Sequence, residues 1–257
     1  MKILVCVKQV PDNEAAVKIN ESKQWIDTDE KTVFRLNRFD EYAIEEAVQI
    51  RETFPGVIID AITAGPKRAE SALRRAMGMG ADNGIHIVMS DNYHFPFEIA
   101  SLISAYAKDK NYNMILTGVM SEDGMNSQTG PMIAAMLDIP FAASCISEKL
   151  IRDRSAVYVE REIEGGLRDS LELELPALIA VQSGINHPRY PSLSNVLRAK
   201  KQDILTIDAV SLKTPDGREK IISIEYPRKS GKSVLIEGTR KEKAAKLLDI
   251  LHGESLI

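Results

Sequence analysis

Residues 57–89 read VIIDAITAGPKRAESALRRAMGMGADNGIHIVM, and this stretch decides the fold. It begins with a continuous apolar and β-branched run over 57–63, which is typical of a strand buried on both faces of a parallel sheet. A Gly-Pro pair ends the run, and Pro66 is suited to the first turn of a helix predicted over 67–78. A second buried strand is predicted over 84–89. A strand, a helix and another strand in this order predict two parallel strands joined by a right-handed crossover.

The same alternation of strands and helices extends to both sides of this unit. Further strands are predicted over 3–7 and 114–117, and further helices over 41–54, 97–108 and 131–137. The chain is therefore expected to have an α/β fold with a doubly wound, mostly parallel sheet. In such sheets, ligands bind outside the carboxyl ends of the strands, where the strand order reverses. The segments at those ends are 7–9, 63–65 and 118–129.

Two segments near the start of the chain have a more irregular pattern. Residues 9–12 are expected to form a turn that ends the first strand, and 20–35 a polar loop or a short hairpin. Asn37 or Asp40 is suited to the N-cap of the helix that follows. Because the apolar residues of that helix recur at helical spacing, its acidic residues are expected on the opposite, polar face: Glu41, Glu45, Glu46 and Glu52.

The pattern changes after residue 145. Two runs, 156–163 and 170–175, flank a Gly-Gly turn and predict a β-hairpin, and another apolar run follows over 177–181. Residues 183–195 are rich in Pro, Asn and Ser, so they are expected to form an ordered loop or a mobile arm. A terminal amphipathic helix is predicted over 239–251.

The composition is that of an ordinary globular protein, and it excludes several classes of function. The 257 residues suffice for one large α/β domain with an appendage, or for two small domains. A net charge of −4 offers no basic surface for nucleic acid. Two cysteines without ligand spacing and four scattered histidines predict neither a disulfide framework nor a metal site.

The hydrophobic runs are short. No run approaches the roughly 20 apolar residues that a membrane-spanning helix needs, so no membrane insertion is expected. The first ten residues read as a buried strand and not as a secretion signal or a transit peptide. We therefore expect a soluble, cytoplasmic protein, or a protein of the mitochondrial matrix if the source is eukaryotic.

The loop over 118–130, GVMSEDGMNSQTG, is the most informative stretch for function. It follows a buried strand and leads into a helix whose free N–H groups favour an anion. Neutral donors come from Asn126, Ser127, Gln128 and Thr129. Because the loop has neither the Walker A lysine nor GxGxxG spacing, phosphoryl transfer is not indicated. An ordinary loop with an N-cap at Ser127 or Thr129 explains the same residues equally well.

No set of residues with chemistry of its own emerges, so no catalytic residue is predicted. Residues 37–40 are explained by helix capping alone. Cys6 lies inside an apolar run without a histidine or other base beside it, which predicts a buried small side chain and not a nucleophile. If the chain takes part in catalysis, a bound cofactor or a partner supplies the reacting atoms.

Motifs spread over residues 1–201 resemble the β subunit of electron-transfer flavoproteins. They are Val-Cys-Val-Lys at 5–8, Asn-Arg-Phe-Asp-Glu-Tyr-Ala-Ile-Glu-Glu-Ala at 37–47, Gly-Met-Gly-Ala-Asp at 78–82 and Gln-Thr-Gly at 128–130. The most specific stretch, 159–201, has Val-Glu-Arg-Glu-Ile-Glu-Gly-Gly-Leu at 159–167, Asn-His-Pro-Arg-Tyr-Pro-Ser-Leu-Ser-Asn at 186–195 and Arg-Ala-Lys-Lys at 198–201. The tail beyond 201 is only weakly similar.

This resemblance implies the small subunit of a heterodimer that carries electrons, and not a stand-alone enzyme. In that family the larger subunit holds most of the FAD site. The smaller one usually holds a structural AMP in a domain of the adenine nucleotide α-hydrolase type, which would here be residues 1–182, including the hairpin at 156–181. The implied cofactor contacts are Cys6, Asn37, Arg38, Phe39, Asp40, Ala64, Gly118, Val119, Met120, Asp123, Asn126, Ser127, Gln128 and Thr129.

The resemblance also implies a route for the electrons. Acyl-CoA dehydrogenases of fatty acid oxidation are the expected donors, and the electrons pass toward the quinone pool through a membrane quinone oxidoreductase. Residues 183–201 would form a protruding loop and helix that recognise the partner, and 202–257 a C-terminal arm packed on the larger subunit. The expected partner contacts are Leu193 as an apolar anchor, Glu162 against the larger subunit, and Arg189, Tyr190 and Arg198.

Two alternative functions stay open. The loop over 118–130 begins Gly-Val-Met where the family commonly has Gly-Lys-Gln or Gly-Arg-Gln, and its Asp-Gly followed by Gln-x-Gly-Pro is similar to electron-bifurcating members. Those members hold a second FAD in place of AMP and oxidise NADH, whereas the Asn-x-Pro-Arg-Tyr of the arm favours the ordinary class. The other alternative is a free-standing adenine-nucleotide-binding module. The hairpin, arm and terminal helix argue against it, because they have too little core of their own.

Overall fold

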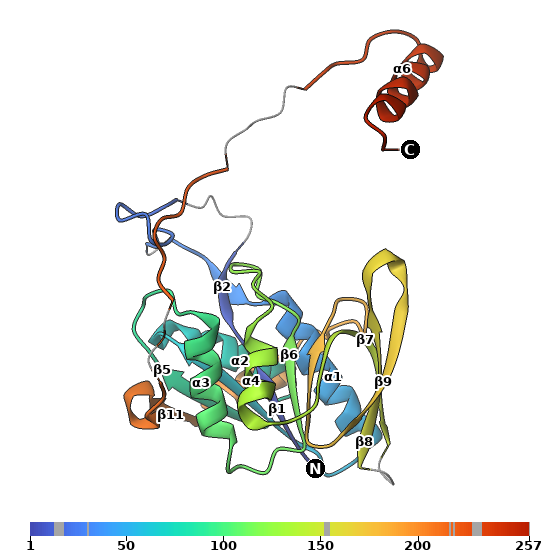
Figure 1. The fold of residues 1–257 in the computed structure, drawn as a ribbon. Helices are drawn as coiled ribbons and strands as arrows, with labels where there is room; N and C mark the ends of the chain where they lie inside the picture. The colour runs from blue at the N-terminus through green and yellow to red at the C-terminus, as the bar shows by residue number, and fades with distance from the viewer. Residues whose placement is uncertain are drawn as a thin grey trace. The chain divides into compact units, whose positions relative to one another are not determined.

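The computed structural model describes residues 1–12, 18–29, 31–151, 155–215, 217, 219–227 and 233–256 (Figure 1). The chain divides into two compact units, Met1–Ser223 and Ile224–Ile257. The first unit contains the sheet and all the residues of the candidate site. The second contains one helix, α6 (Arg240–Gly253), which begins at a capping box formed by Thr239 and Glu242 and confirms the predicted terminal helix.

The first unit is built on a nine-stranded sheet within the described residues, in the order β11-β5-β4-β1-β6-β10-β7-β8-β9. Its strands are β1 (Lys2–Cys6), β4 (Ile58–Gly65), β5 (Asn83–Val88), β6 (Met114–Gly118), β7 (Phe141–Ile151), β8 (Ala156–Glu162), β9 (Arg168–Glu174), β10 (Ala177–Val181) and β11 (Ile204–Asp208). The strands from β11 to β7 are parallel, and β8 and β9 continue the sheet in antiparallel pairing. The mostly parallel α/β sheet predicted from the sequence is therefore confirmed.

Helices cover both faces of the sheet. They are α1 (Arg38–Thr53), α2 (Glu70–Met79), α3 (Pro96–Ala107), α4 (Thr129–Leu137) and α5 (Leu193–Lys201). Figure 1 shows α3 and α4 in front of the sheet and α1 behind it. Along β1, Ile3 and Val5 belong to the hydrophobic core with α1 and α2, whereas Leu4 and Cys6 belong to the core with α3 and α4. A strand buried on both faces must be apolar at every position, which explains the unbroken hydrophobic runs of the sequence.

The strand order reverses at β1. The chain passes from β1 to its neighbour β4 and on to β5, and then returns to the other side of β1 as β6. The loops after β1 and β6 therefore leave the same edge of the sheet in opposite directions, which is the arrangement that opens a crevice in doubly wound folds.

Three strands differ from the expectation. Residues 9–12 were expected as a turn, but β2 (Gln9–Pro11) pairs antiparallel with β3 (Phe34–Leu36). Strand β7 was not expected, because its Ala- and Ser-rich sequence lacks a clear period. Strand β11 lies in the segment expected as the C-terminal arm, and it pairs in parallel with β5 at the edge of the sheet. Strands β2, β3 and β11 are short and lie at sheet edges, so they carry little hydrophobic pattern and only their pairing reveals them.

The hairpin is as predicted. Strands β8 and β9 pair along their whole length, and a turn at Glu164–Gly166 joins them, with Gly165 and Gly166 at φ 77° and 71°. In Figure 1 the hairpin extends past the end of the sheet. Within the described residues, no helix is both long and apolar enough to cross a bilayer.

Candidate functional site

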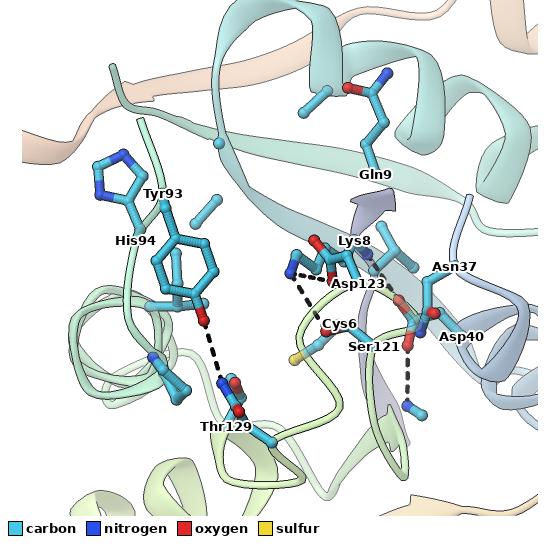
Figure 2. Close-up of a pocket in the computed structure, with 18 of the residues that line it drawn as sticks. Cys6, Lys8, Gln9, Asn37, Asp40, Tyr93, His94, Ser121, Asp123 and Thr129 are labelled. Carbon is cyan, nitrogen blue, oxygen red and sulfur yellow. Dashed lines mark hydrogen bonds and ion pairs between the residues drawn. The ribbon is translucent and has the colours of Figure 1, made fainter. Parts of the chain in front are cut away.

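A cavity of about 180 Å³ opens at the point where the strand order reverses (Figure 2). The loops after β1, β4 and β6 form its inner wall. Twelve of the fourteen expected cofactor contacts line it: Cys6, Asn37, Asp40, Ala64, Gly118, Val119, Met120, Asp123, Asn126, Ser127, Gln128 and Thr129. The rule that places ligands at strand ends thus leads to the cavity.

The other two expected contacts, Arg38 and Phe39, lie outside the cavity lining. Residues three apart share one face of a helix, so Asn37 and Asp40 face the cavity together while the two residues between them turn away. Arg38 lines a second, smaller hollow with Arg189.

Asp40 ties two strand ends together. Its Oδ2 accepts the Lys8 N–H at 2.7 Å, and its Oδ1 accepts the Gly118 N–H at 3.1 Å. Burial raises the pKa of Asp40 to about 7, against the opposing effect of its hydrogen bonds from Asn37, Lys8 and Gly118. The carboxyl group therefore fixes the backbone at the ends of β1 and β6.

Asn37 holds the loop that follows β6. Its Nδ2 donates to the Met120 carbonyl at 2.9 Å, and its Oδ1 accepts the Glu122 N–H at 3.1 Å. Asn37 occupies the N-cap position of α1, as expected, but its side chain makes no capping bond. The Glu122 side chain makes a capping bond in place of Asn37, because its carboxylate accepts the Arg38 N–H at 3.2 Å. The capping motif thus serves to dock the cavity loop.

Gly118 allows the closest approach in this region. A Cβ at Gly118 would lie 2.5 Å from the Asp40 Oδ1 and 2.6 Å from the Phe39 Cβ. Cβ atoms do not approach other heavy atoms so closely, so the contact between the end of β6 and the start of α1 requires glycine.

The lining also includes residues beyond the expected cofactor contacts. They are chiefly Lys8, Gln9, Trp25, Phe34, Arg68, Tyr93, His94, Thr117 and Ser121. Lys8 directly follows β1 and falls inside the expected segment 7–9, and Tyr93 and His94 follow β5, so the strand-end rule could have found them. Trp25 and Phe34 reach the cavity only through the folding of residues 18–36 over it.

The cations of the lining are already paired. The Lys8 Nζ lies 2.7 Å from the Asp123 carboxylate and donates to the Ser121 hydroxyl at 3.3 Å. The Arg68 guanidinium lies 2.8 Å from the Asp91 carboxylate. The ligand therefore meets mainly neutral donors, which come from the loop before α4 and from the first N–H groups of that helix.

Two further groups of the inner wall bear on the chemistry. Thr117 has a buried hydroxyl without a hydrogen-bond partner in the described structure. Burial raises the pKa of the Cys6 thiol, which keeps it protonated and unreactive. The cavity can bind a small anion-bearing molecule, and the Cys6 thiol is not poised to attack it.

The loop over 183–192 is fixed on α1 by Arg189. Its Nε and Nη2 each lie 2.8 Å from an oxygen of Glu45, and the guanidinium also pairs with Glu52. Burial acts to raise the pKa of Glu45, but the hydrogen bonds from Arg189 and Gln49 outweigh it and lower this pKa.

The polar face expected for α1 is therefore partly wrong. Glu45 and Glu46 are only 3% and 6% exposed. The loop covers them, because Arg189 pairs with Glu45 and the Asn186 Nδ2 donates to the Glu46 Oε2 at 2.7 Å. Helical periodicity cannot show that a distant segment will cover a polar face.

Glu46 also meets a second carboxyl group, that of Glu148 on β7. Burial and the adjacent Glu46 raise the pKa of Glu148 to about 8, and burial raises the pKa of Glu46 as well. The Glu148 Oε2 is buried, and a hydrogen bond joins the two carboxyl groups. Two carboxyl groups that share a buried site retain a proton at neutral pH, because two adjacent negative charges would repel each other.

The expected partner contacts fall into two groups. Tyr190 and Leu193 are 90% and 75% exposed, and Glu162 is exposed at the end of β8. Arg189 and Arg198 are engaged within the chain, since Arg189 pairs with Glu45 and the Arg198 Nη2 donates to the Met77 carbonyl at 3.1 Å. The first group is thus open to a partner, and the two arginines hold the loop and α5 in place.

These features define a doubly wound α/β protein with its ligand cavity at the topological switch point. A model of the electron transfer flavoprotein domain matches residues 25–212. The electron transfer flavoprotein subunit beta of Bacillus subtilis is 34% identical over 265 residues and covers 100% of both chains. That of Bos taurus is 34% identical over 254 residues, which is 97% of this chain and 98% of the relative. The chain belongs to the β-subunit family of electron transfer flavoproteins.

Proposed function

We propose that the chain is the small subunit of a heterodimeric electron-transfer flavoprotein and that it holds AMP in the cavity at the switch point. The observation that carries the nucleotide assignment is a cavity whose cations are paired and whose remaining donors are neutral. Asn126, Gln128, Thr129 and the first N–H groups of α4 suit a single phosphate group.

The proposed role of AMP is structural. The loop after β6 depends on contacts with Asn37 and Asp40 at one end and leads into α4 at the other. A ligand bound along this loop stabilises the folded state by mass action. Within this chain the nucleotide therefore holds the switch-point loops together and takes no part in electron transfer.

FAD, held mainly by the larger subunit, supplies the redox chemistry when bound. The β8–β9 hairpin offers a surface for that subunit, because Glu162 lies at its end and Ile163 and Leu167 at its turn are 39% and 64% exposed. Tyr190 and Leu193 offer a separate apolar surface, which we assign to acyl-CoA dehydrogenases. Electrons would pass from these donors to the flavin and on toward the quinone pool.

The ratio of cofactors in the heterodimer tests the assignment. The chain is co-purified with its larger subunit, the complex is denatured, and the released FAD and AMP are separated by chromatography and quantified. One FAD and one AMP per heterodimer are expected. A complex that contains no AMP would overturn the proposal that this cavity holds it.

A pair of matched variants connects the nucleotide to the cavity. Thr129→Phe places a bulky ring in the first turn of α4, where the phosphate is proposed to bind, so it should lower the AMP content. Thr206→Phe changes an exposed threonine on β11 and should leave the AMP content unchanged. Full AMP retention in Thr129→Phe would show that the nucleotide does not bind at the first turn of α4.

A second candidate is the electron-bifurcating class, in which this chain holds a second FAD and the complex oxidises NADH. The aromatic side chains of Trp25, Phe34 and Tyr93 in the cavity lining favour it, because another ring system can pack against them. This candidate predicts two FAD, no AMP and reduction of the complex by NADH. The free-standing module predicts a stable chain with bound nucleotide in the absence of any larger subunit.

A further inference from the structure

Aromatic side chains form the outer wall of the cavity. The ring centroids of Trp25 and Tyr93 lie 4.0 Å apart at an interplanar angle of 37°. Phe34 also lines the cavity, and the Arg68 guanidinium lies 4.1 Å from the centre of its ring. Trp25 and Tyr93 are only partly buried, so they keep surface that a ligand in the cavity can cover.

Tyr93 is held in place from two sides. Its ring meets the edge of Phe95 at a centroid distance of 5.2 Å. Its hydroxyl oxygen accepts a hydrogen bond from the Asn126 Nδ2 at 3.1 Å. Figure 2 shows this bond, with Tyr93 and Thr129 on one side of the view and Lys8 and Asp40 on the other. The aromatic wall is thus attached directly to the loop that carries the neutral donors.

Trp25 reaches the wall because residues 18–29 fold back on themselves. Ile19 and Ile26 form an antiparallel bridge, and the backbone N–H of Asp27 donates to the Lys18 carbonyl at 2.7 Å. The Asn20 N–H donates to the Trp25 carbonyl at 2.9 Å. These local bonds hold Trp25 over Tyr93 without help from a hydrophobic core, in a segment that is otherwise exposed and polar.

The cavity therefore has two chemically different regions. One is the aromatic pair, whose two tilted rings offer apolar surface. The other is the loop before α4, which offers neutral donors and helix N–H groups. Stacking of a nucleobase on an aromatic side chain contributes about 1–3 kcal/mol. A molecule with a planar ring at one end and a phosphate at the other matches both regions.

We propose that Trp25 and Tyr93 form the ring-binding wall of the nucleotide site, so that residues 18–29 close over the planar heterocycle of the ligand. The proposal rests on the proposed function, in that the ligand is taken to be a nucleotide. The shared chemistry is a fused planar heterocycle joined to phosphate, and the adenine ring of AMP and the ring systems of FAD are two sources of it.

Binding to the heterodimer tests the wall. The complex is stripped of its exchangeable nucleotide, and AMP and FAD are titrated separately by calorimetry into the wild type and into variants of Trp25. Trp25→Ala should weaken binding of the ligand by about 5- to 100-fold, as expected for a lost stack. Trp25→Phe, which keeps a flat ring, should recover most of the affinity. Val33→Ala is the matched control, because Val33 is an exposed apolar residue beside the same segment and outside the lining.

The outcomes separate the two proposals. If the wild type binds a nucleotide and Trp25→Ala binds it equally well, the role of Trp25 in ring binding is wrong. The proposal that the cavity holds a nucleotide is then unaffected. If the wild type binds neither AMP nor FAD, the proposed function fails at this site. A loss confined to AMP identifies adenine as the stacked ring, and a loss confined to FAD supports the bifurcating candidate.

A second measurement does not depend on the alanine variant. Trp25 is the one tryptophan of the sequence. The difference in emission between the wild-type complex and Trp25→Phe therefore isolates Trp25 from the tryptophans of the larger subunit. Bound nucleotide should protect this emission from quenching by acrylamide. Equal quenching with and without bound nucleotide would contradict the proposal that Trp25 contacts the ring of the ligand.

Discussion

Two loops leave adjacent strands of the sheet, and one lines the cavity while the other exposes Tyr190 and Leu193. The cavity loop, residues 119–128, follows β6, and the arm loop, residues 183–192, follows β10. They begin side by side, since the Val119 N–H donates to the Val181 carbonyl at 2.9 Å. Both are fixed on α1, the first at its start and the second along its middle.

The two loops use different chemistry on that helix. The cavity loop is held by Asn37 and by the buried Asp40, which bind backbone groups and leave its side chains at the ligand. The arm loop is held by Arg189, which forms ion pairs with Glu45 and Glu52 and leaves Tyr190 and Leu193 exposed. One helix thus positions a loop that lines the cavity and a loop that exposes Tyr190 and Leu193, and the polar residues of the helix decide which part holds each.

The cavity loop should be the more sensitive of the two to backbone crowding. Gly118→Ala places a Cβ 2.5 Å from the Asp40 Oδ1 and 2.6 Å from the Phe39 Cβ, so the end of β6 must move away from α1. We expect a loss of about 2–4 kcal/mol in the free energy of unfolding, measured by chemical denaturation, together with loss of bound nucleotide.

Gly124→Ala, within the cavity loop that follows Gly118, is its control. The nearest atom to a Cβ at Gly124 is 3.4 Å away, which is an ordinary contact. A change below about 0.5 kcal/mol is expected there. Equal stability of the two variants would show that the approach of β6 to α1 is not tight.

The arm loop should depend on its ion pairs. Arg189→Met leaves Glu45 buried without its cation, and a buried carboxylate without a partner is costly. Because Arg189 is itself partly exposed, we expect a smaller loss than for a fully buried pair, about 1–3 kcal/mol, and faster proteolysis within residues 183–192.

Arg168→Met provides the comparison for a surface pair. Arg168 lies 3.7 Å from Glu160 with a side chain that is 68% exposed, so its loss should change stability by less than about 0.5 kcal/mol. If Arg189→Met cost no more than Arg168→Met, the arm loop would be held by packing and not by charge.

The buried carboxyl pair beneath the arm loop should make stability depend on pH. The folded-state pKa of Glu148 is raised to about 8, whereas a carboxyl group of an unfolded chain titrates near 4.3. Between these values the folded chain holds a proton that the unfolded chain releases, so stability falls as pH rises toward 8. Asp40, with its pKa raised to about 7, acts in the same direction.

Glu148→Gln removes the titrating partner and should reduce this fall, with a gain on the order of 1 kcal/mol at pH 8.5 relative to the wild type. Other charged groups near the pair are Glu45, Arg189 and Arg161, and they are kept in the variant. Glu174→Gln on the exposed end of β9 is the control. Parallel pH profiles for the wild type and Glu148→Gln, measured by thermal unfolding, would rule out a shared proton at this place.

Leu193 should have the smallest effect on stability. Its side chain is 75% exposed at the first position of α5, so Leu193→Ala should change the free energy of unfolding by less than about 0.5 kcal/mol. If Leu193 anchors an acyl-CoA dehydrogenase, kcat/KM for reduction of the flavin by that enzyme should fall about tenfold. Leu205→Ala, an exposed leucine on β11, is the control. An unchanged rate in Leu193→Ala would remove it as the anchor.

Much of the fold could be predicted from local patterns. The unbroken runs of β1, β4 and β6 predict strands buried on both faces, and their alternation with helices predicts the parallel sheet and the edge at which the cavity lies. Most expected cavity residues lie there because they directly follow those strands or begin α1. Arg38 and Phe39 lie outside the cavity lining, since a contiguous motif on a helix cannot face one side throughout, and their role as cofactor contacts stays a prediction.

The residues that escaped prediction share one property. Trp25, Phe34 and Glu148 depend on segments that are distant in sequence: the aromatic wall needs residues 18–36 to fold over the strand ends, and the carboxyl pair needs α1 to meet β7. The burial of Glu45 likewise needs Arg189, which lies 144 residues away in the sequence. No local period records such contacts.

The sequence by itself determined the α/β class, the hairpin, the terminal helix and the edge of the sheet where the cavity opens, because hydrophobic period and turn residues act over a few positions of the chain. The tertiary structure alone decided which side chains meet there. It pairs Lys8 with Asp123, packs Trp25 against Tyr93 and turns the acidic face of α1 into the support of a loop. The physical reason is that hydrogen bonds, ion pairs and ring contacts depend on distances of a few ångströms, which only the assembled sheet and its helices set.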